Sequence, residues 1–117
     1  QYDADQNIFF VDFESMSLRH EADIERIRNI VESILLPLGR KVPVVVNYHG
    51  FDIQEELIDP YANMIKGLMN SCYAQVTRYA TNTFLKARLG DALNARQLKP
   101  GIFESAEEAR AGLAKMP

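Results

Sequence analysis

The fold is decided by one stretch, Val42-Pro43-Val44-Val45-Val46-Asn47-Tyr48-His49-Gly50-Phe51. Its first five residues form an unbroken apolar run, which is typical of a strand covered on both faces. The run stops at the polar Asn47, and Gly50 follows in a segment typical of a turn. The stretch therefore predicts a buried strand that ends in a turn at the edge of a sheet.

The composition of the chain indicates one globular domain over residues 1–117. This length is enough to enclose a hydrophobic core, and 47% of the residues are hydrophobic and 25% charged. The formal net charge is −3 and the basic residues are scattered, so we expect neither nucleic acid nor a membrane surface as a partner. No apolar run reaches the roughly 18 residues of a membrane helix, and no signal peptide is apparent.

Two single residues add to this description. The only cysteine, Cys72, excludes an internal disulfide and fits a reducing, cytoplasmic compartment. The chain begins at Gln1 rather than at a methionine, so we expect a fragment of a longer polypeptide.

The segments before the valine stretch predict a strand and a helix. Residues 1–7 are polar and turn-like, and residues 8–13 predict a strand that is more central than edge. A linker with a short edge strand at 15–18 follows. Pro37 and Gly39 mark the end of an amphipathic helix, in which acids occupy the first turn. The apolar face of this helix is predicted to comprise Ile24, Ile27, Ile30, Val31, Ile34 and Leu35.

The segments after the valine stretch continue the alternation of strands and helices. Asp52-Ile53-Gln54-Glu55 matches a capping box and predicts a short helical turn at 53–58, and Asp59-Pro60 begins a longer helix at 60–72. Further elements are a strand at 73–80, a helix at 83–95, a turn at 99–101, a short strand at 102–103 and a terminal helix from residue 105. The apolar stripe of the 60–72 helix comprises Tyr61, Met64, Ile65, Leu68, Met69 and Cys72.

The order of elements predicts an α/β fold with a mostly parallel sheet of four to five strands. Helices connect the strands by right-handed crossovers and pack on the sheet, as a two-layer or three-layer sandwich.

Polar residues follow three of the predicted strands, at the edge where such sheets bind ligands. An arginine beside threonines at a helix N-terminus is suited to hold a carboxylate or a phosphate. The alternative is that Arg78 only pairs with Asp12 or Glu14 and that Thr81 or Thr83 is only a cap of the helix. The candidate ligand-binding or interface residues are Asn47, Tyr48, His49, Arg78, Tyr79 and Thr81.

Catalytic chemistry is not apparent in the sequence. His49 has no serine or cysteine nucleophile that can be placed beside it, and Cys72 closes a core stripe. Two histidines and one cysteine do not make a metal site, and the six dispersed glycines form no phosphate-binding loop. We therefore expect no catalytic residue, no metal and no cofactor in this chain.

Several motifs together resemble a known family. They are Pro37-Leu38-Gly39-Arg40-Lys41-Val42, Val46-Asn47-Tyr48, Val76-Thr77-Arg78-Tyr79-Ala80-Thr81, Phe84-Leu85-Lys86-Ala87-Arg88-Leu89-Gly90-Asp91-Ala92-Leu93 and Ile102-Phe103-Glu104-Ser105-Ala106-Glu107-Glu108-Ala109. In this order the chain resembles the C-terminal extension of long bacterial acyl-CoA:acetate/3-ketoacid CoA-transferases. The resemblance covers nearly the whole chain.

The resemblance implies a parent enzyme that moves coenzyme A between carboxylic acids through a glutamyl-CoA thioester. The nucleophilic glutamate of that family lies in a glycine-flanked motif of the catalytic core, and this chain has no such motif. The resemblance thus implies a non-catalytic domain that serves assembly or covers the active site. Its partner would be the catalytic core of the parent or, in a homo-oligomer, a second copy, and a coenzyme A thioester would be the parent's substrate.

The element order also resembles STAS-type domains, which are interaction modules. After Val46 the chain has Asn47, Tyr48 and His49, and not the phosphorylatable serine of that fold. The alternative function is therefore a stand-alone module that binds a protein or a small anion near Asn47, Arg78 and Thr81. In a third interpretation, the domain itself holds part of the acyl-CoA, and Arg78 contacts a phosphate or the carboxylate of the acid substrate.

Overall fold

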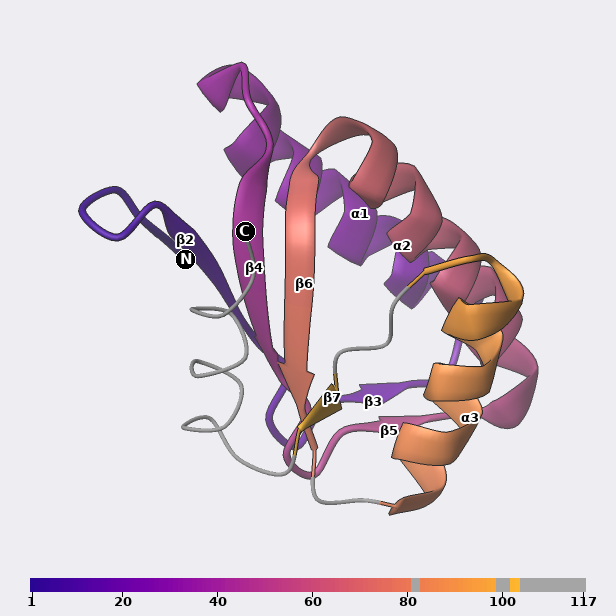
Figure 1. The fold of residues 1–117 in the computed structure, drawn as a ribbon. Coiled ribbons are helices and arrows are strands. Elements are labelled where there is room, and N and C mark those ends of the chain that lie inside the picture. The colour runs from indigo at the N-terminus through magenta and orange to yellow at the C-terminus, as the bar shows by residue number, and fades with distance from the viewer. Residues whose placement is uncertain (81–82, 99–101, 104–117) are drawn as a thin grey trace.

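The main sheet has five strands in the part of the chain that the structure describes. The computed structural model describes residues 1–80, 83–98 and 102–103. The strands lie in the order β1 (Tyr2–Asp3), β2 (Ile8–Asp12), β4 (Val42–Asn47), β6 (Tyr73–Tyr79) and β7 (Ile102–Phe103) (Figure 1). Strands β2, β4, β6 and β7 are parallel, and only β1 is antiparallel to its neighbour β2. The predicted α/β fold with a mostly parallel sheet is confirmed.

Three helices cover one face of this sheet: α1 (Glu21–Leu35), α2 (Ile58–Ser71) and α3 (Thr83–Ala95). Each connects two neighbouring parallel strands, and the chain always moves in the same direction across the sheet. Right-handed crossovers therefore place all three helices on the same side, as Figure 1 shows. Helix α2 lies between α1 and α3 and contacts both. The described part of the chain is thus a two-layer arrangement.

The valine strand lies where the sequence predicts it. Val44 stands opposite Phe9 of β2 and Val76 of β6, so β4 is enclosed by strands on both sides. Val42, Val44 and Val46 join the core beneath the helices, and Val45 points to the other face and is also only 4% exposed. Burial on both faces, as inferred from the unbroken apolar run, is confirmed.

Pro43 is tolerated in this central strand because of a local irregularity. The register between β4 and β6 shifts between Val42 and Pro43, so that Ala74 has no partner on β4. A proline lacks the N–H that a regular ladder requires, and a bulge removes that requirement.

A second, two-stranded sheet continues the chain beyond the carboxyl ends of β2 and β4. It pairs β3 (Ser17–Leu18) with β5 (Asp52–Ile53) in parallel. The two preceding turns lie against each other, since Ser15 N–H donates to the His49 carbonyl and a Cβ at Gly50 would stand 3.2 Å from Ser15 Oγ. Gly50 also has a φ of 68°, a conformation that favours glycine.

The predicted helical turn at 53–58, with Asp52 as its cap, is wrong at its start. Asp52 N–H donates to the Met16 carbonyl and Gln54 N–H donates to the Leu18 carbonyl, so this segment is a strand. A 3₁₀ turn, η2 (Glu55–Leu57), begins only after Gln54. Strand pairing with a distant segment outweighs the local capping signal here.

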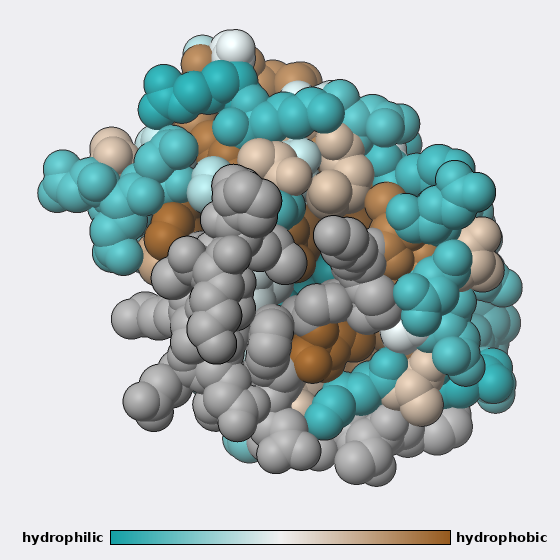
Figure 2. All heavy atoms as spheres, viewed as in Figure 1, coloured by the Kyte–Doolittle hydropathy of each residue, from teal (hydrophilic) through white to brown (hydrophobic). Residues whose placement is uncertain are grey.

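Other boundaries follow the sequence more closely. Helix α1 ends in a 3₁₀ turn, η1 (Leu36–Leu38), that contains Pro37 and stops at Gly39 with a φ of 68°. The segment 1–7, predicted as turn-like, includes β1. Figure 2 shows hydrophilic residues over much of the surface at the right of the view, where α2 and α3 lie. No described helix is long and apolar enough to cross a membrane. The predicted turn at 99–101 and the terminal helix from 105 lie outside the described residues.

Candidate functional site

Three of the six candidate site residues lie at the carboxyl edge of the sheet. Asn47 stands in register between Asp12 of β2 and Tyr79 of β6, and all three side chains point away from the helices. Asn47 Nδ2 donates to Asp12 Oδ1 at 3.1 Å, and Asn47 Oδ1 accepts the backbone N–H of His49 at 2.8 Å. His49 is exposed, and Asn47 and Tyr79 are half-buried. This row is accessible, and the hydrogen bonds of Asn47 hold the turn that follows β4.

Tyr48, a fourth candidate, is a core residue. Its side chain is 1% exposed, and its hydroxyl lies 2.6 Å from the hydroxyl of Tyr61 on α2. Its ring lies 4.9 Å from that of Phe51 and 5.9 Å from that of Phe13, measured between centroids. These aromatic side chains fill the corner at which β2 and β4 turn toward the second sheet. Tyr48 therefore packs in this corner, and its side chain is not exposed at the carboxyl edge.

Arg78 is also directed into the core. It is the register partner of Val46, so it faces the helix layer, and it is 1% exposed. The predicted pairing with Asp12 is wrong, because Asp12 points to the opposite face of the sheet and accepts hydrogen bonds from Asn47 and from the backbone N–H of Glu14. The Arg78 side chain is therefore enclosed beneath the helix layer and is not exposed at the carboxyl edge.

The surroundings of Arg78 include two tyrosines with perturbed acidity. Burial raises the pKa of Tyr61 and the pKa of Tyr73 well above the usual value of 10.0. The neighbouring Tyr48 raises both further, and the positive charge of Arg78 opposes the shift in each. These hydroxyls therefore stay protonated in the folded protein. Thr81, the sixth candidate, lies outside the described residues.

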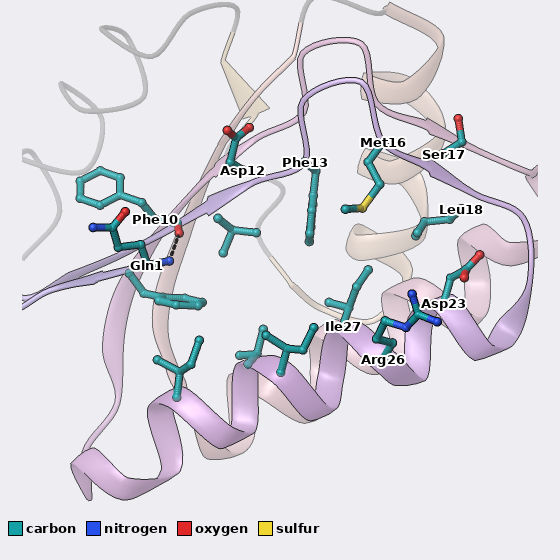
Figure 3. Close-up of a pocket in the computed structure, with 15 residues that line it drawn as sticks. Gln1, Phe10, Asp12, Phe13, Met16, Ser17, Leu18, Asp23, Arg26 and Ile27 are labelled. Atoms are coloured by element: carbon teal, nitrogen blue, oxygen red, sulfur yellow. Dashed lines mark hydrogen bonds between the residues drawn. The ribbon is translucent and has the colours of Figure 1, made fainter.

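An apolar groove that the sequence did not predict lies between β2 and α1. It has a volume of about 320 Å³ and is open to solvent (Figure 3). In Figure 3, Phe13 and Met16 point toward α1, and Ile27 points up from the helix toward them. Arg26 and Asp23 lie near one end, whereas Gln1 lies at the other. The apolar residues that line this β2–α1 groove are Phe9, Phe10, Val11, Phe13, Met16, Leu18, Ile27, Ile30, Val31 and Ile34.

The groove leaves several large apolar side chains in contact with water. Ile30 is 52% exposed, Met16 is 39% exposed and Ile34 is 38% exposed. The predicted apolar face of α1 is therefore only partly buried, because Ile30 and Ile34 lie outside the core. The main sheet ends beside α1, and its last strand, β1, has only two residues, so the sheet does not reach under this side of the helix.

One feature of the sequence would have indicated this groove. At 100° per residue, the apolar positions of α1 from Ile30 to Leu35 span roughly 140° of the helix surface. Ile24, Ile27, Val31 and Leu35 fill the part of this arc that faces the sheet and α2, and they are buried. An apolar arc wider than one packed face indicates a second contact surface.

The described residues offer little polar chemistry for catalysis. They contain no group of three or more His, Cys, Asp or Glu side chains that could hold a metal ion. Cys72 is buried at the end of α2, and Ser71 Oγ donates to its Sγ at 3.5 Å. The arrangement is suited to binding apolar side chains in the β2–α1 groove.

Comparisons with known proteins do not identify the chain. No protein-family model, no curated protein and no solved structure matches it.

Proposed function

We propose that this chain is the C-terminal accessory domain of an acyl-CoA:acetate/3-ketoacid CoA-transferase. The domain itself is non-catalytic and serves assembly or active-site covering in a parent enzyme that transfers coenzyme A between carboxylic acids. Support for the parent comes from the resemblance of the sequence, whose motifs follow the order of the family along nearly the whole chain. Two of these motifs lie side by side in the fold, at the ends of β4 and β6.

The observation that carries the accessory role is the β2–α1 groove. Half-exposed Ile30 and Ile34 form an apolar surface that another part of the parent polypeptide can cover. Exposed apolar surface of this kind, gathered in one groove, marks contact sites in proteins. It supports a domain that packs against the rest of its parent.

The placement of the glutamates supports a non-catalytic role. In the described part of the chain all of them are exposed or half-buried. Glu25 and Glu32 form ion pairs with Arg28 on the surface of α1, and Glu55 pairs with Arg88. A glutamate that attacks a thioester requires an enclosed setting that excludes water, and these positions do not provide it.

The test compares the full polypeptide with a version that ends before Gln1. We expect the shortened protein to transfer coenzyme A more slowly or to change its oligomeric state. A change of oligomeric state together with rate indicates assembly, and a change of kcat or KM with the oligomer intact indicates active-site covering. Unchanged activity and unchanged oligomeric state would contradict the proposal.

A further inference from the structure

The first residues of the chain lie beside the β2–α1 groove. Gln1 and Phe10 exchange two backbone hydrogen bonds, of 2.7 Å and 2.8 Å, and Tyr2 stands opposite Phe9 (Figure 3). This is a regular antiparallel ladder. If residues before Gln1 continue this ladder, the residue directly before Gln1 lies opposite Val11. The residue before that one lies opposite Asp12.

The corresponding side of β2 is open. Phe13 N–H donates to the Asn47 carbonyl of β4, and backbone groups alternate in direction along a strand. The N–H and C=O of Asp12 thus point away from β4, toward the side on which β1 lies. Within residues 1–80, 83–98 and 102–103, no strand pairs with this side of β2 beyond Phe10. This edge can accept an extended segment.

Side chains of such a segment would alternate between the two faces of the sheet. Val11 faces the helix layer, because its register partner Val46 belongs to the core beneath the helices. Directly opposite residues of an antiparallel pair share a face. The residue before Gln1 would therefore point into the groove, toward the wall formed by Ile30 and Ile34.

We propose that the β2–α1 groove is filled by the segment of polypeptide that leads into Gln1. This segment continues β1 along β2 and places every second side chain, which we expect to be apolar, in the groove. The inference rests on the proposed function, because it needs a catalytic part that precedes Gln1. A covalently attached segment has a high effective concentration at the groove, which favours it over a separate partner.

Thiol accessibility tests the proposal with a matched pair of variants. Ile30→Cys places a thiol on the groove wall, and Leu36→Cys places one outside the groove lining; the native side chains are 52% and 51% exposed. Native Cys72 is 1% exposed and contributes little background. Ile34→Cys serves as a second reporter on the groove wall if Ile30→Cys does not fold.

The rate of modification by a soluble disulfide reagent is measured in chain 1–117, in the same chain preceded only by the short segment that leads into Gln1, and in the full polypeptide. We expect Ile30→Cys to react about tenfold or more slowly in both longer proteins, because the reaction needs access to the thiolate, whereas Leu36→Cys keeps its rate. Equal rates for Ile30→Cys in chain 1–117 and in the extended chain would overturn the inference, and protection seen only in the full polypeptide would assign the groove to the catalytic core instead. Protection within chain 1–117 that grows with protein concentration would also overturn it, in favour of a second copy.

The same proteins separate this inference from the proposed function. If the full polypeptide transfers coenzyme A and Ile30→Cys reacts freely in it, the proposed function stands and the groove segment is rejected. If Ile30→Cys is protected in a full polypeptide that transfers no coenzyme A, the groove segment stands and the proposed function is rejected. A gene that encodes no residues before Gln1 other than a start codon would overturn both.

Discussion

Helices α1 and α2 each carry an apolar stripe at three- and four-residue spacing, and they differ in how much of it the fold covers. In α2, Tyr61, Met64, Ile65 and Leu68 are all buried. In α1 the stripe is divided, because Ile30 and Ile34 face the β2–α1 groove while their neighbours are buried. The difference comes from position. Helix α2 lies between two helices, and α1 lies at the end of the layer.

The comparison shows what an amphipathic pattern specifies. The spacing of apolar residues determines which side of a helix avoids water, and the neighbouring elements determine whether that side is covered. Two helices with similar stripes therefore differ in outcome: the stripe of α2 lies in the core, and part of the stripe of α1 is left exposed to solvent.

The largest expected effect comes from truncating isoleucines at matched positions of the two helices. Ile65 on α2 is 4% exposed, and Ile30 on α1 is 52% exposed. Ile65→Ala should lower the free energy of unfolding by about 2–5 kcal/mol, because it leaves a cavity in the core. Ile30→Ala should change it by less than about 1 kcal/mol, as at other surface positions. Urea unfolding of chain 1–117 measures both, and equal losses would contradict the distinction between the helices.

A second, smaller effect concerns the buried hydroxyl of Tyr61 on α2. No tyrosine lies on the buried face of α1. Tyr61→Phe removes one of two hydroxyls that lie 2.6 Å apart, and it leaves the Tyr48 hydroxyl in the core without this partner. We expect a loss of about 1–3 kcal/mol in the free energy of unfolding. The double variant Tyr48→Phe/Tyr61→Phe should lose less than the sum of the single variants, since it removes both members of the pair. Additive losses would show that the two hydroxyls do not interact.

The pH dependence of the same variant gives an independent check. The pKa values of Tyr61 and Tyr73 are raised above 10.0 in the folded protein, chiefly by burial. The unfolded chain therefore releases these protons as the pH passes about 10, while the folded chain keeps them. Their contribution to stability is complete below that pH and declines above it. Tyr61→Phe should make the decline shallower, and an unchanged slope would contradict the assignment.

Much of the fold could be predicted from the sequence, because local and tertiary preferences agree there. Helix α3 has the predicted bounds, 83–95, since threonine precedes an apolar periodicity that the core then buries. The double-sided burial of 42–46 follows from an apolar run that only a central strand can accommodate. Where a sequence pattern is compatible with only one kind of element, the structure contains the element that the pattern predicts.

The candidate site was less predictable, because its residues depend on contacts that a single chain segment does not reveal. Arg78 stands two residues after Val76 on β6 and so shares its buried face, although it is near the strand end. Tyr48 follows the strand, and the bend of the chain turns it inward onto Tyr61. Strands of two residues, such as β1, β3 and β5, are too short to show an alternation. The wide apolar arc of α1 indicates a second contact surface, but the local pattern does not show that the sheet ends beside it and leaves a groove.

The smallest expected effect distinguishes how the two helices begin. At the start of α1, Asp23 Oδ2 accepts hydrogen bonds from the backbone N–H groups of Arg19 and His20, each at 3.1 Å. At the start of α2, the N-cap residue is Leu57, and no side chain makes a capping hydrogen bond. The hydrogen bond from Arg19, followed by that from His20, lowers the pKa of Asp23 below 3.8. The charged carboxylate therefore stabilises α1 above pH 3.8, and this contribution is lost as the pH falls through the lowered pKa.

Asp23→Asn should thus reduce stability slightly near neutral pH and leave it unchanged in strong acid, where the wild-type carboxyl is protonated. Glu21→Gln is the matched control, because it removes a charge from the same first turn without removing a bond to the backbone. Thermal unfolding across this pH range measures the difference between the variants. An equal effect of both substitutions would mean that the charge at the start of α1, and not the capping geometry of Asp23, separates this helix from α2.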